Sequence, residues 1–292
     1  MSIEIIAELD DSRLEPFRNL KATNRTRWTN QFIAEGSLVV ERLLDSRFQI
    51  QSILVSRELQ RQLPANVPPD CPIYFLEHAL AEQLVGYSFH TGVLACGLRE
   101  PSPPLAALVG PDGRSSLVAV CPNVNDPENI GAIIRLSAGF GLMGVILGPS
   151  CADPFSRRVL RVSMGTAFTL PIVESVDLRG DLVRLRDEFG FELCATVLDG
   201  AAEPLESAVP AVKMGLLFGN EKHGLDPSWV ELCARKLTIP MAAGADSLNV
   251  AVAAGIFFHH LQHVCGKSAT PAADPARNRS ADAARTPAAT DS

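Results

Sequence analysis

The sequence predicts an α/β protein whose second half forms a mostly parallel sheet and whose first half is a smaller α/β unit. Along the 292 residues, short apolar runs alternate with segments that have helical periodicity. The apolar runs of the second half are continuous, as is typical of parallel strands covered on both faces. A segment dense in Pro, Gly and Ser, residues 101–116, separates the halves as a predicted linker. The length also suits about two domains.

The first unit is predicted to span residues 1–100. In "FIAEGSLVVERLLDS", Phe32, Leu38, Val39 and Leu43 stand at helical spacing, which predicts a helix. "IQSILVS", "PIYFL" and "TGVLACGL" are then predicted as strands.

The second unit is predicted to span residues 117–265. The strand "LVAVC" is followed by the helix "ENIGAIIRLSAGF" and the strand "GVILG". Further strands are predicted in "LPIVES", "FELCATVL", "MGLLFG" and "KLTIP", and a last helix in "SLNVAVAAGIFFHHLQHV". Residues 266–292 are rich in Ala, Pro, Ser and Asp, which predicts a disordered tail.

Composition excludes several classes of protein. The seven cysteines contain no C-x-x-C pair, which argues against a zinc site or a disulfide framework and suits a reducing compartment. We therefore expect a cytoplasmic protein without a metal. No run approaches the roughly 18 apolar residues of a membrane span, and the acidic start is unlike a signal peptide. The net charge of −7 does not indicate a polyanionic partner, although residues 13–27 form a local basic cluster.

Two motifs are set aside. "GFGLMG", residues 139–144, matches G-x-G-x-x-G, but it closes a helix and opens a strand, whereas a dinucleotide fingerprint does the reverse. It is interpreted as a helix C-terminus and turn, so an NAD-linked reductase is not favoured. His259 and His263 share a helical face, but no neighbouring Glu or Cys completes a metal set.

Polar residues in three segments exceed what packing requires. In the first helix, Ile130, Ile133 and Ile134 form the buried stripe, while Arg135 projects beside it. Arg135 is therefore predicted either to form a surface ion pair or to reach a ligand. Asn129 stands near the helix start, where an N-cap is the simplest role.

The other two segments follow predicted strands. "NEKHG" lies after the strand that ends at Gly219, and the carboxyl ends of strands are where open α/β sheets bind ligands. Glu221 there is either solvated or faces a cationic ligand. Next, Asp226 and Pro227 predict a helix start. In "LTIPMAAGADSLNVAVAAG" a strand enters a Gly/Ala-rich loop, and Ser247 is the candidate N-cap of the last helix.

Together, "PENIGAIIRLSAGFG", "LLFGNEKHGL" and "IPM…DSLNVAVAAG" resemble, in order and spacing, the three motifs of the SpoU (TrmH-type) RNA 2′-O-ribose methyltransferases of the SPOUT superfamily. "SRRVLRVSMGTAFTLPI" resembles the segment between the first two motifs. "FIAEGSLVVERLL" and "HTGVLA" resemble the N-terminal substrate-binding domain, related to ribosomal protein L30e, of many members. The resemblance covers most of residues 28–264. It implies a deep trefoil knot, a homodimer, and S-adenosylmethionine as the cofactor.

The resemblance also implies the site. Residues matched to the cofactor pocket are Thr196, Val197, Gly219, Ile239, Leu248 and Asn249. Residues matched to the catalytic set are Asn129, Arg135, Glu221, Ser247 and Asn249. The family proposal makes the arginine the base that deprotonates the ribose hydroxyl. Because guanidinium stays protonated, we instead assign Arg135 to a bidentate clamp on the adjacent phosphate, and both roles stay open.

The remaining roles follow the same resemblance. Asn129 is expected to orient Arg135 or the ribose, and Glu221 to complement cationic groups. Ser247 and Asn249 are expected to shape the loop. RNA contacts are predicted from charge in two basic clusters, residues 13–27 and "SRRVLR" at 156–161, namely at Arg25, Arg27, Arg157, Arg158 and Arg161. Ribosomal RNA is favoured as substrate, and the alternatives are transfer RNA and a catalytically inactive RNA-binding paralogue.

Overall fold

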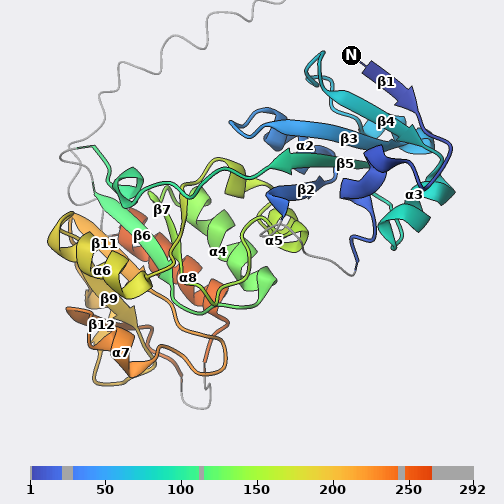
Figure 1. Ribbon diagram of the computed structural model, residues 1–292. Helices are drawn as coiled ribbons and strands as arrows, with labels where there is room; N and C mark the ends of the chain where they lie inside the picture. The colour runs from blue at the N-terminus through green and yellow to red at the C-terminus, as the bar shows by residue number, and fades with distance from the viewer. Residues whose placement is uncertain (1, 22–28, 112–114, 243–246, 265–292) are drawn as a thin grey trace, which may run out of the picture.

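The computed structural model describes residues 2–21, 29–111, 115–242 and 247–264, which form two sheets with different topologies (Figure 1). The first sheet has the strand order β1-β4-β3-β5-β2. Its strands are β1 (Ser2–Ile5), β2 (Gln31–Glu35), β3 (Ile50–Ser56), β4 (Pro72–Leu76) and β5 (Val93–Leu98). β1, β4 and β3 run parallel, whereas β5 is antiparallel to both β3 and β2. The first unit is therefore a mixed α/β layer.

Short helices cover both faces of this sheet. They are η1 (Ser12–Phe17), α2 (Ser37–Leu44), η2 (Arg57–Gln62) and α3 (His78–Val85). Leu14, Phe17 and Leu84 pack with one face of the sheet, while Val40 and Leu43 of α2 pack on the other.

One element differs from the sequence prediction. The helical spacing predicts a helix that includes Phe32, but "QFIAE" is strand β2, paired with β5 so that Phe32 lies opposite Gly97. A Cβ on Gly97 would lie 2.4 Å from the Phe32 ring, so glycine leaves the space that the ring fills. Gly36, with φ of 90°, turns the chain, and α2 begins only at Ser37. Cross-strand pairing outweighs the local helical spacing here.

The second sheet has the order β10-β12-β9-β11-β6-β7-β8, and its pairs are parallel, which confirms the predicted parallel sheet. Its strands are β6 (Ser116–Cys121), β7 (Gly144–Leu147), β8 (Ile172–Glu174), β9 (Glu192–Thr196), β10 (Glu203–Pro204), β11 (Lys213–Leu217) and β12 (Arg235–Thr238).

Helices lie on both faces of this sheet, as continuous apolar strands require. They are α4 (Pro127–Gly139), α5 (Arg157–Val162), α6 (Leu178–Asp187), α7 (Pro227–Val230) and α8 (Val250–His259), with the short turns η3 (Leu105–Leu108), η4 (Thr166–Phe168), η5 (Leu205–Ser207) and η6 (His260–Val264). Along β6, Ala119 and Cys121 join the core of α4 and α8, while Val118 and Val120 join that of α6.

Helix α4 follows the predicted pattern. Ile130, Ile133 and Ile134 are fully buried. The helix ends at Gly139, Gly141 has φ of 73°, and β7 begins at Gly144. The interpretation of "GFGLMG" as a helix end and turn is thereby confirmed.

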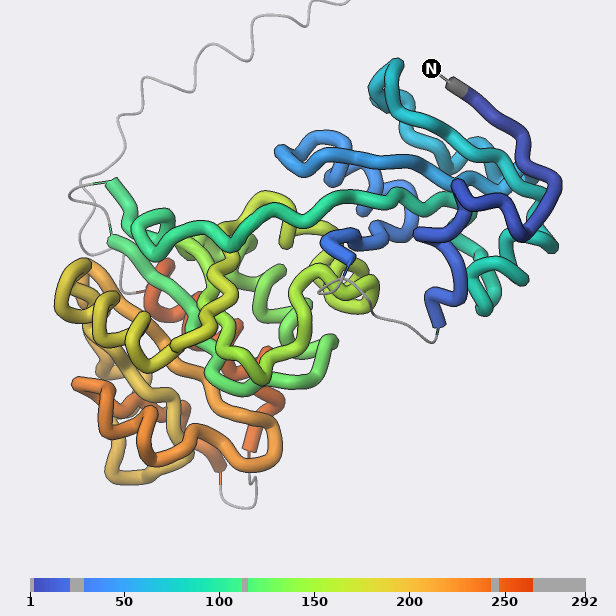
Figure 2. Tube along the Cα trace, viewed as in Figure 1, coloured from blue at the N-terminus to red at the C-terminus, as the bar shows by residue number. Residues whose placement is uncertain are grey.

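The two units share one core. The ring of Phe32 lies 5.4 Å from that of Phe155 and 5.5 Å from that of Phe168, centroid to centroid. Within the predicted linker, Leu105 and Leu108 of η3 are buried against the second sheet. Figure 2 shows the chain after β5 running along one side of the second unit before it enters β6. The first unit is thus held against the second.

Candidate active site

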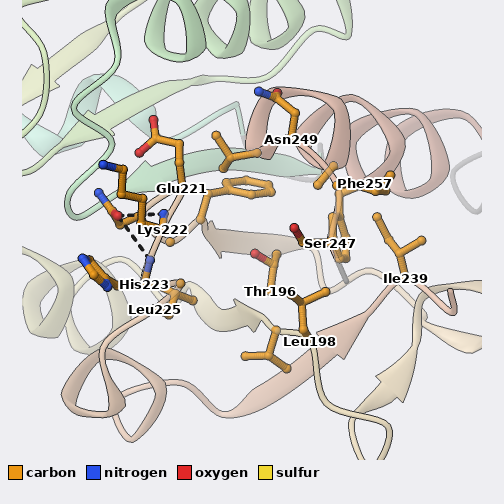
Figure 3. A pocket seen from close by; sticks show the side chains of 18 of the residues that line it. Thr196, Leu198, Glu221, Lys222, His223, Leu225, Ile239, Ser247, Asn249 and Phe257 are labelled. Atoms are coloured by element: carbon orange, nitrogen blue, oxygen red, sulfur yellow. Dashed lines mark hydrogen bonds between the residues drawn. The ribbon is translucent and has the colours of Figure 1, made fainter. Parts of the chain in front are cut away.

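A cavity of about 730 Å³ opens where neighbouring parallel strands of the second sheet end. Thr196 is the last residue of β9 and Val197 follows it, Gly219 follows β11 closely, and Ile239 follows β12. Ser247, Leu248 and Asn249 close the cavity from the entry of α8 (Figure 3). These strands are adjacent in the sheet order β12-β9-β11, so the topology brings together segments far apart in the sequence.

Gly219 lets the loop 220–224 fold tightly at the end of β11. A Cβ on Gly219 would lie 2.2 Å from the carbonyl carbon of Gly224, so another residue does not fit. The loop closes by two backbone hydrogen bonds of 2.9 Å between Asn220 and Gly224. Gly224 has φ of 68°, which glycine adopts readily. The loop thus has a defined shape at the cavity rim.

Asn129 connects the three polar segments. Its Nδ2 donates to Glu221 Oε1 at 2.8 Å, and its Oδ1 accepts from Asn249 Nδ2 at 2.9 Å. The backbone N–H of Asp126 also lies 3.4 Å from Glu221 Oε1. Asn129 is only 7% exposed, whereas Glu221 and Asn249 are exposed, so a buried amide links two side chains at the surface.

The helix caps differ from the simplest sequence interpretation. Asp126, not Asn129, caps α4 by accepting from the Glu128 N–H. Asn249, not Ser247, caps α8 by accepting from the N–H groups of Ala251 and Val252. Asn129 and Ser247 are therefore not needed as caps. The predicted cap at Asp226, with Pro227 following, is confirmed for α7.

Arg135 lies outside the residues that line the cavity. It is exposed on α4, and its guanidinium makes no hydrogen bond or ion pair with any residue that the structure describes. The surface ion pair predicted as one alternative is therefore not formed within the described ranges. One turn before Arg135 on the same helix face, Ala132 lines an apolar groove between α4 and α8.

The predicted RNA-binding arginines occupy different environments. Arg157 pairs with Glu35, whose side chain is 4% exposed, and its guanidinium lies 4.2 Å from the Tyr87 ring centroid. Arg157 thus joins the two units. Arg158 pairs with exposed Glu128, while Arg161 is exposed. Arg25 and Arg27, like the predicted tail 266–292, lie outside the described residues.

Burial dominates the electrostatics behind the cavity. It raises the pKa of Cys121, at the end of β6, well above its usual range, and the charges of Cys151 and Glu221 add to the effect. At the loop exit, hydrogen bonds from Ser228 to the Asp226 carboxylate lower the pKa of Asp226. Within the described residues no cluster of His, Cys, Asp or Glu could hold a metal ion, and no helix there is long and apolar enough to cross a membrane.

Sequence reasoning missed several cavity residues. Leu198, Lys222, His223, Leu225, Met241 and Phe257 also line the cavity. Most lie within or beside the quoted motifs, so their position in the motif loops was an available signal. Phe257 is different, because it reaches the cavity from the C-terminal half of α8, whose contacts the sequence does not give.

The fold and the cavity define an α/β protein with a ligand site at the carboxyl ends of parallel strands. Residues 116–259 match the sequence profile of the SpoU rRNA methylase family. An uncharacterized tRNA/rRNA methyltransferase of Mycobacterium bovis is 36% identical over 89% of this chain and 91% of the relative. The 23S rRNA (guanosine(2553)-2′-O)-methyltransferase RlmP of Bacillus subtilis is 29% identical over 88% of this chain and 98% of that protein.

Solved structures agree. The AdoMet-bound rRNA methyltransferase of Sinorhizobium meliloti superposes with a TM-score of 0.75 at 27% identity, covering 88% of this chain and 96% of that chain. The chain therefore belongs to the SpoU rRNA methylase family and is a methyltransferase of that family.

Proposed function

We propose that this chain transfers a methyl group from S-adenosylmethionine to a ribose 2′-hydroxyl of ribosomal RNA. The observation that carries the proposal is the Asn249–Asn129–Glu221 chain of hydrogen bonds at the cavity, which joins the three motif segments. RlmP and the 23S rRNA (guanosine-2′-O-)-methyltransferase RlmB of Acinetobacter baylyi, 30% identical over 60% of this chain, support the ribose and ribosomal RNA.

S-adenosylmethionine is the cofactor, and the cavity fits it. The walls are apolar at Phe218 and Ile239, as an adenine ring requires, and polar at Thr196. Thr196 Oγ1 donates to the Leu217 carbonyl at 2.8 Å, which joins the ends of β9 and β11 under the site. Gly219, Leu248 and Val197 complete the proposed pocket through backbone and small side chains. When bound, the cofactor supplies a methyl group activated by a positively charged sulfur.

The polar residues orient the reacting groups. Glu221 complements positive charge at the site, and Asn129 fixes the direction of its carboxylate. Asn249 holds Asn129 and starts α8, while Ser247 lies exposed at the cavity edge, where a nucleotide would enter. Positioning of this kind supplies roughly 7–11 kcal/mol of barrier reduction in good intramolecular models.

Arg135 requires a second copy of the chain in this scheme. It does not line the cavity of its own protomer, yet the motif resemblance assigns it to the reaction. Beside it, Leu136, Phe140 and Ile256 form an apolar groove, and Ile256 is 39% exposed. A homodimer through this face buries the groove and brings Arg135 to the partner's cavity, where it clamps a phosphate of the RNA.

Mixed dimers test this arrangement. Arg135→Ala and Gly219→Ala subunits are each expected to be inactive alone. When co-expressed with different tags, the heterodimer regains one intact site, and roughly half of the wild-type activity per dimer returns. Absence of recovery in purified heterodimers would place Arg135 in its own protomer's reaction or outside the reaction.

Ribose-methylation mapping tests the substrate. Ribosomal and transfer RNA from cells with and without the gene are compared, and loss of one ribosomal 2′-O-methyl group is expected. Loss of a tRNA methylation instead would favour transfer RNA as the substrate. Relatives named tRNA/rRNA methyltransferases are compatible with either RNA. No methyl transfer to either RNA would favour an inactive RNA-binding paralogue.

The proposal extends to the rest of the chain. Residues 1–100 are assigned to an L30e-like RNA-binding domain, 101–116 to the connection, and 117–265 to the catalytic domain with its trefoil knot. RNA contacts are assigned to exposed Arg158 and Arg161, and to Arg25 and Arg27. Arg157 pairs with Glu35 and keeps 26% of its side chain exposed, and an RNA contact is assigned to that exposed part. A cytoplasmic location follows from a ribosomal RNA substrate.

A further inference from the structure

The loop between β11 and α7 carries two exposed polar side chains at the cavity mouth, Lys222 and His223. Neither side chain makes a hydrogen bond or ion pair with another residue in the part of the chain that the structure describes. Among the described residues that line the cavity, Lys222 is the only lysine or arginine. The residue before it, Glu221, is hydrogen-bonded to Asn129. An unpaired cation at a ligand site is available for an anionic partner.

Hydrogen bonds to Asn220 hold the backbone of Lys222 and His223. Asn220 Oδ1 accepts from the N–H groups of Lys222, at 2.9 Å, and His223, at 3.3 Å. Asn220 Nδ2 donates to the Asn123 carbonyl at 3.0 Å, which ties the loop to the segment between β6 and α4. The same segment leads to Asn129 in α4. The loop and the Asn249–Asn129–Glu221 hydrogen bonds are therefore attached to the same part of the chain.

The direction of the side chains selects among ligands. In Figure 3, Lys222 and His223 extend from the loop away from Thr196, Ser247 and Ile239. A group bound deep in the cavity is therefore not their partner. Their position suits an anion that lies across the mouth, where the chain of a substrate RNA would pass when one nucleotide enters.

We propose that Lys222, with His223 beside it, binds a backbone phosphate of the RNA next to the methylated nucleotide, and that Asn220 is the residue that positions them. This inference rests on the proposed function and adds a substrate contact to it. Within the described residues Lys222 has no ion pair to break on binding, and two backbone hydrogen bonds already close its loop, so the contact gains from counterion release at little cost in backbone entropy.

The test replaces Lys222 by Gln in the full-length protein and uses transcribed large-subunit ribosomal RNA as the probe. RNA affinity is measured at several salt concentrations by filter binding. The slope of log affinity against log salt is expected to decrease in magnitude by about 0.7 to 0.9, equivalent to one lost phosphate contact. The KM for RNA is expected to rise about fivefold at ~0.1 M salt, with kcat changed less than about twofold.

Matched variants separate the contact from general effects. Lys236, an exposed lysine of β12 away from the cavity, serves as the charge control, and Lys236→Gln is expected to keep the wild-type slope. Lys222→Arg, which retains the charge, is expected to restore most of the RNA affinity. His223→Gln is expected to raise the KM for RNA by a smaller factor than Lys222→Gln.

Asn220→Asp tests the positioning role. The aspartate keeps the oxygen that accepts from Lys222 and His223 but loses the donor to the Asn123 carbonyl. We expect a raised KM for RNA that the additional Lys222→Gln change does not raise further. Additive effects in the double variant would show that Asn220 does not act through Lys222.

Two results would overturn the inference while leaving the proposed function intact. If Lys222→Gln left the salt slope and the KM unchanged while the wild-type protein methylated the RNA, only the proposed phosphate contact would be refuted. A parallel loss of S-adenosylmethionine affinity by calorimetry would place Lys222 on the cofactor instead. A wild-type protein that neither binds S-adenosylmethionine nor methylates RNA would instead contradict the proposed function, and the inference with it.

Discussion

Asn249 and Asn129, 120 positions apart in the chain, share a hydrogen bond of 2.9 Å from Nδ2 to Oδ1. The bond joins the N-cap of α8 to the first turn of α4, and Asn129 continues it to Glu221. The same Asn249 uses its Oδ1 to cap α8. One side chain thus both starts a helix and orders the polar site.

The two functions of Asn249 are separable by substitution. Asn249→Asp keeps the capping oxygen and removes the donor to Asn129, so methyl transfer should fall at least about tenfold while the free energy of unfolding changes by less than ~0.5 kcal/mol. Asn249→Ala removes the cap as well and should cost about 1 kcal/mol of stability. Urea unfolding and a tritiated-methyl assay check both. Equal unfolding midpoints for the two variants would contradict the capping role.

Gly219 should tolerate no side chain. In Gly219→Ala the added Cβ meets the backbone of Gly224, so the loop 220–224 must shift and S-adenosylmethionine affinity should fall more than about tenfold by calorimetry. At Gly139, the end of α4, a Cβ would meet no atom of the described residues within 4 Å. Gly139→Ala should therefore bind normally and be neutral or more stable by up to ~1 kcal/mol. Tight cofactor binding by Gly219→Ala would show that the loop does not form the pocket.

Arg157 should contribute more to stability than to RNA binding. Arg157→Gln leaves the Glu35 carboxylate buried without its partner, which should cost about 3 kcal/mol in urea unfolding. Adding Glu35→Gln should recover part of that loss, and a double-mutant cycle measures the coupling. The exposed Arg161 is the matched residue: Arg161→Gln should change stability by less than ~0.5 kcal/mol and weaken RNA binding. The reverse pattern would restore Arg157 as primarily an RNA contact.

Arg135 should be sensitive to shape as well as charge. Arg135→Ala should abolish methyl transfer but leave S-adenosylmethionine affinity within about twofold, because Arg135 does not line the cavity of its own protomer. Arg135→Lys should not rescue activity, since an ammonium cannot replace a planar guanidinium that makes two hydrogen bonds. Near-normal transfer by the lysine variant would contradict the phosphate clamp.

The sequence alone determined the parallel sheet, the stripe of α4 and the motif loops. Local periodicity predicts which residues are buried, both in the continuous apolar strands and in α4 at Ile130, Ile133 and Ile134. Such patterns need no knowledge of distant residues. The "FIAEG" segment shows the limit of this reasoning, because its strand forms only through pairing with β5.

Tertiary structure decided which polar residues act together. By position in the sequence, Asn129 and Ser247 are both plausible N-caps. In the folded chain the N-caps are Asp126 and Asn249. The side chain of Asn129 is therefore available to bind Glu221. In the sequence Arg157 is part of a basic run, and only the folded structure shows that it pairs with Glu35. These contacts are long-range hydrogen bonds and ion pairs, whose geometry depends on how β6, β9, β11 and β12 lie side by side, and no local pattern in the sequence encodes that arrangement.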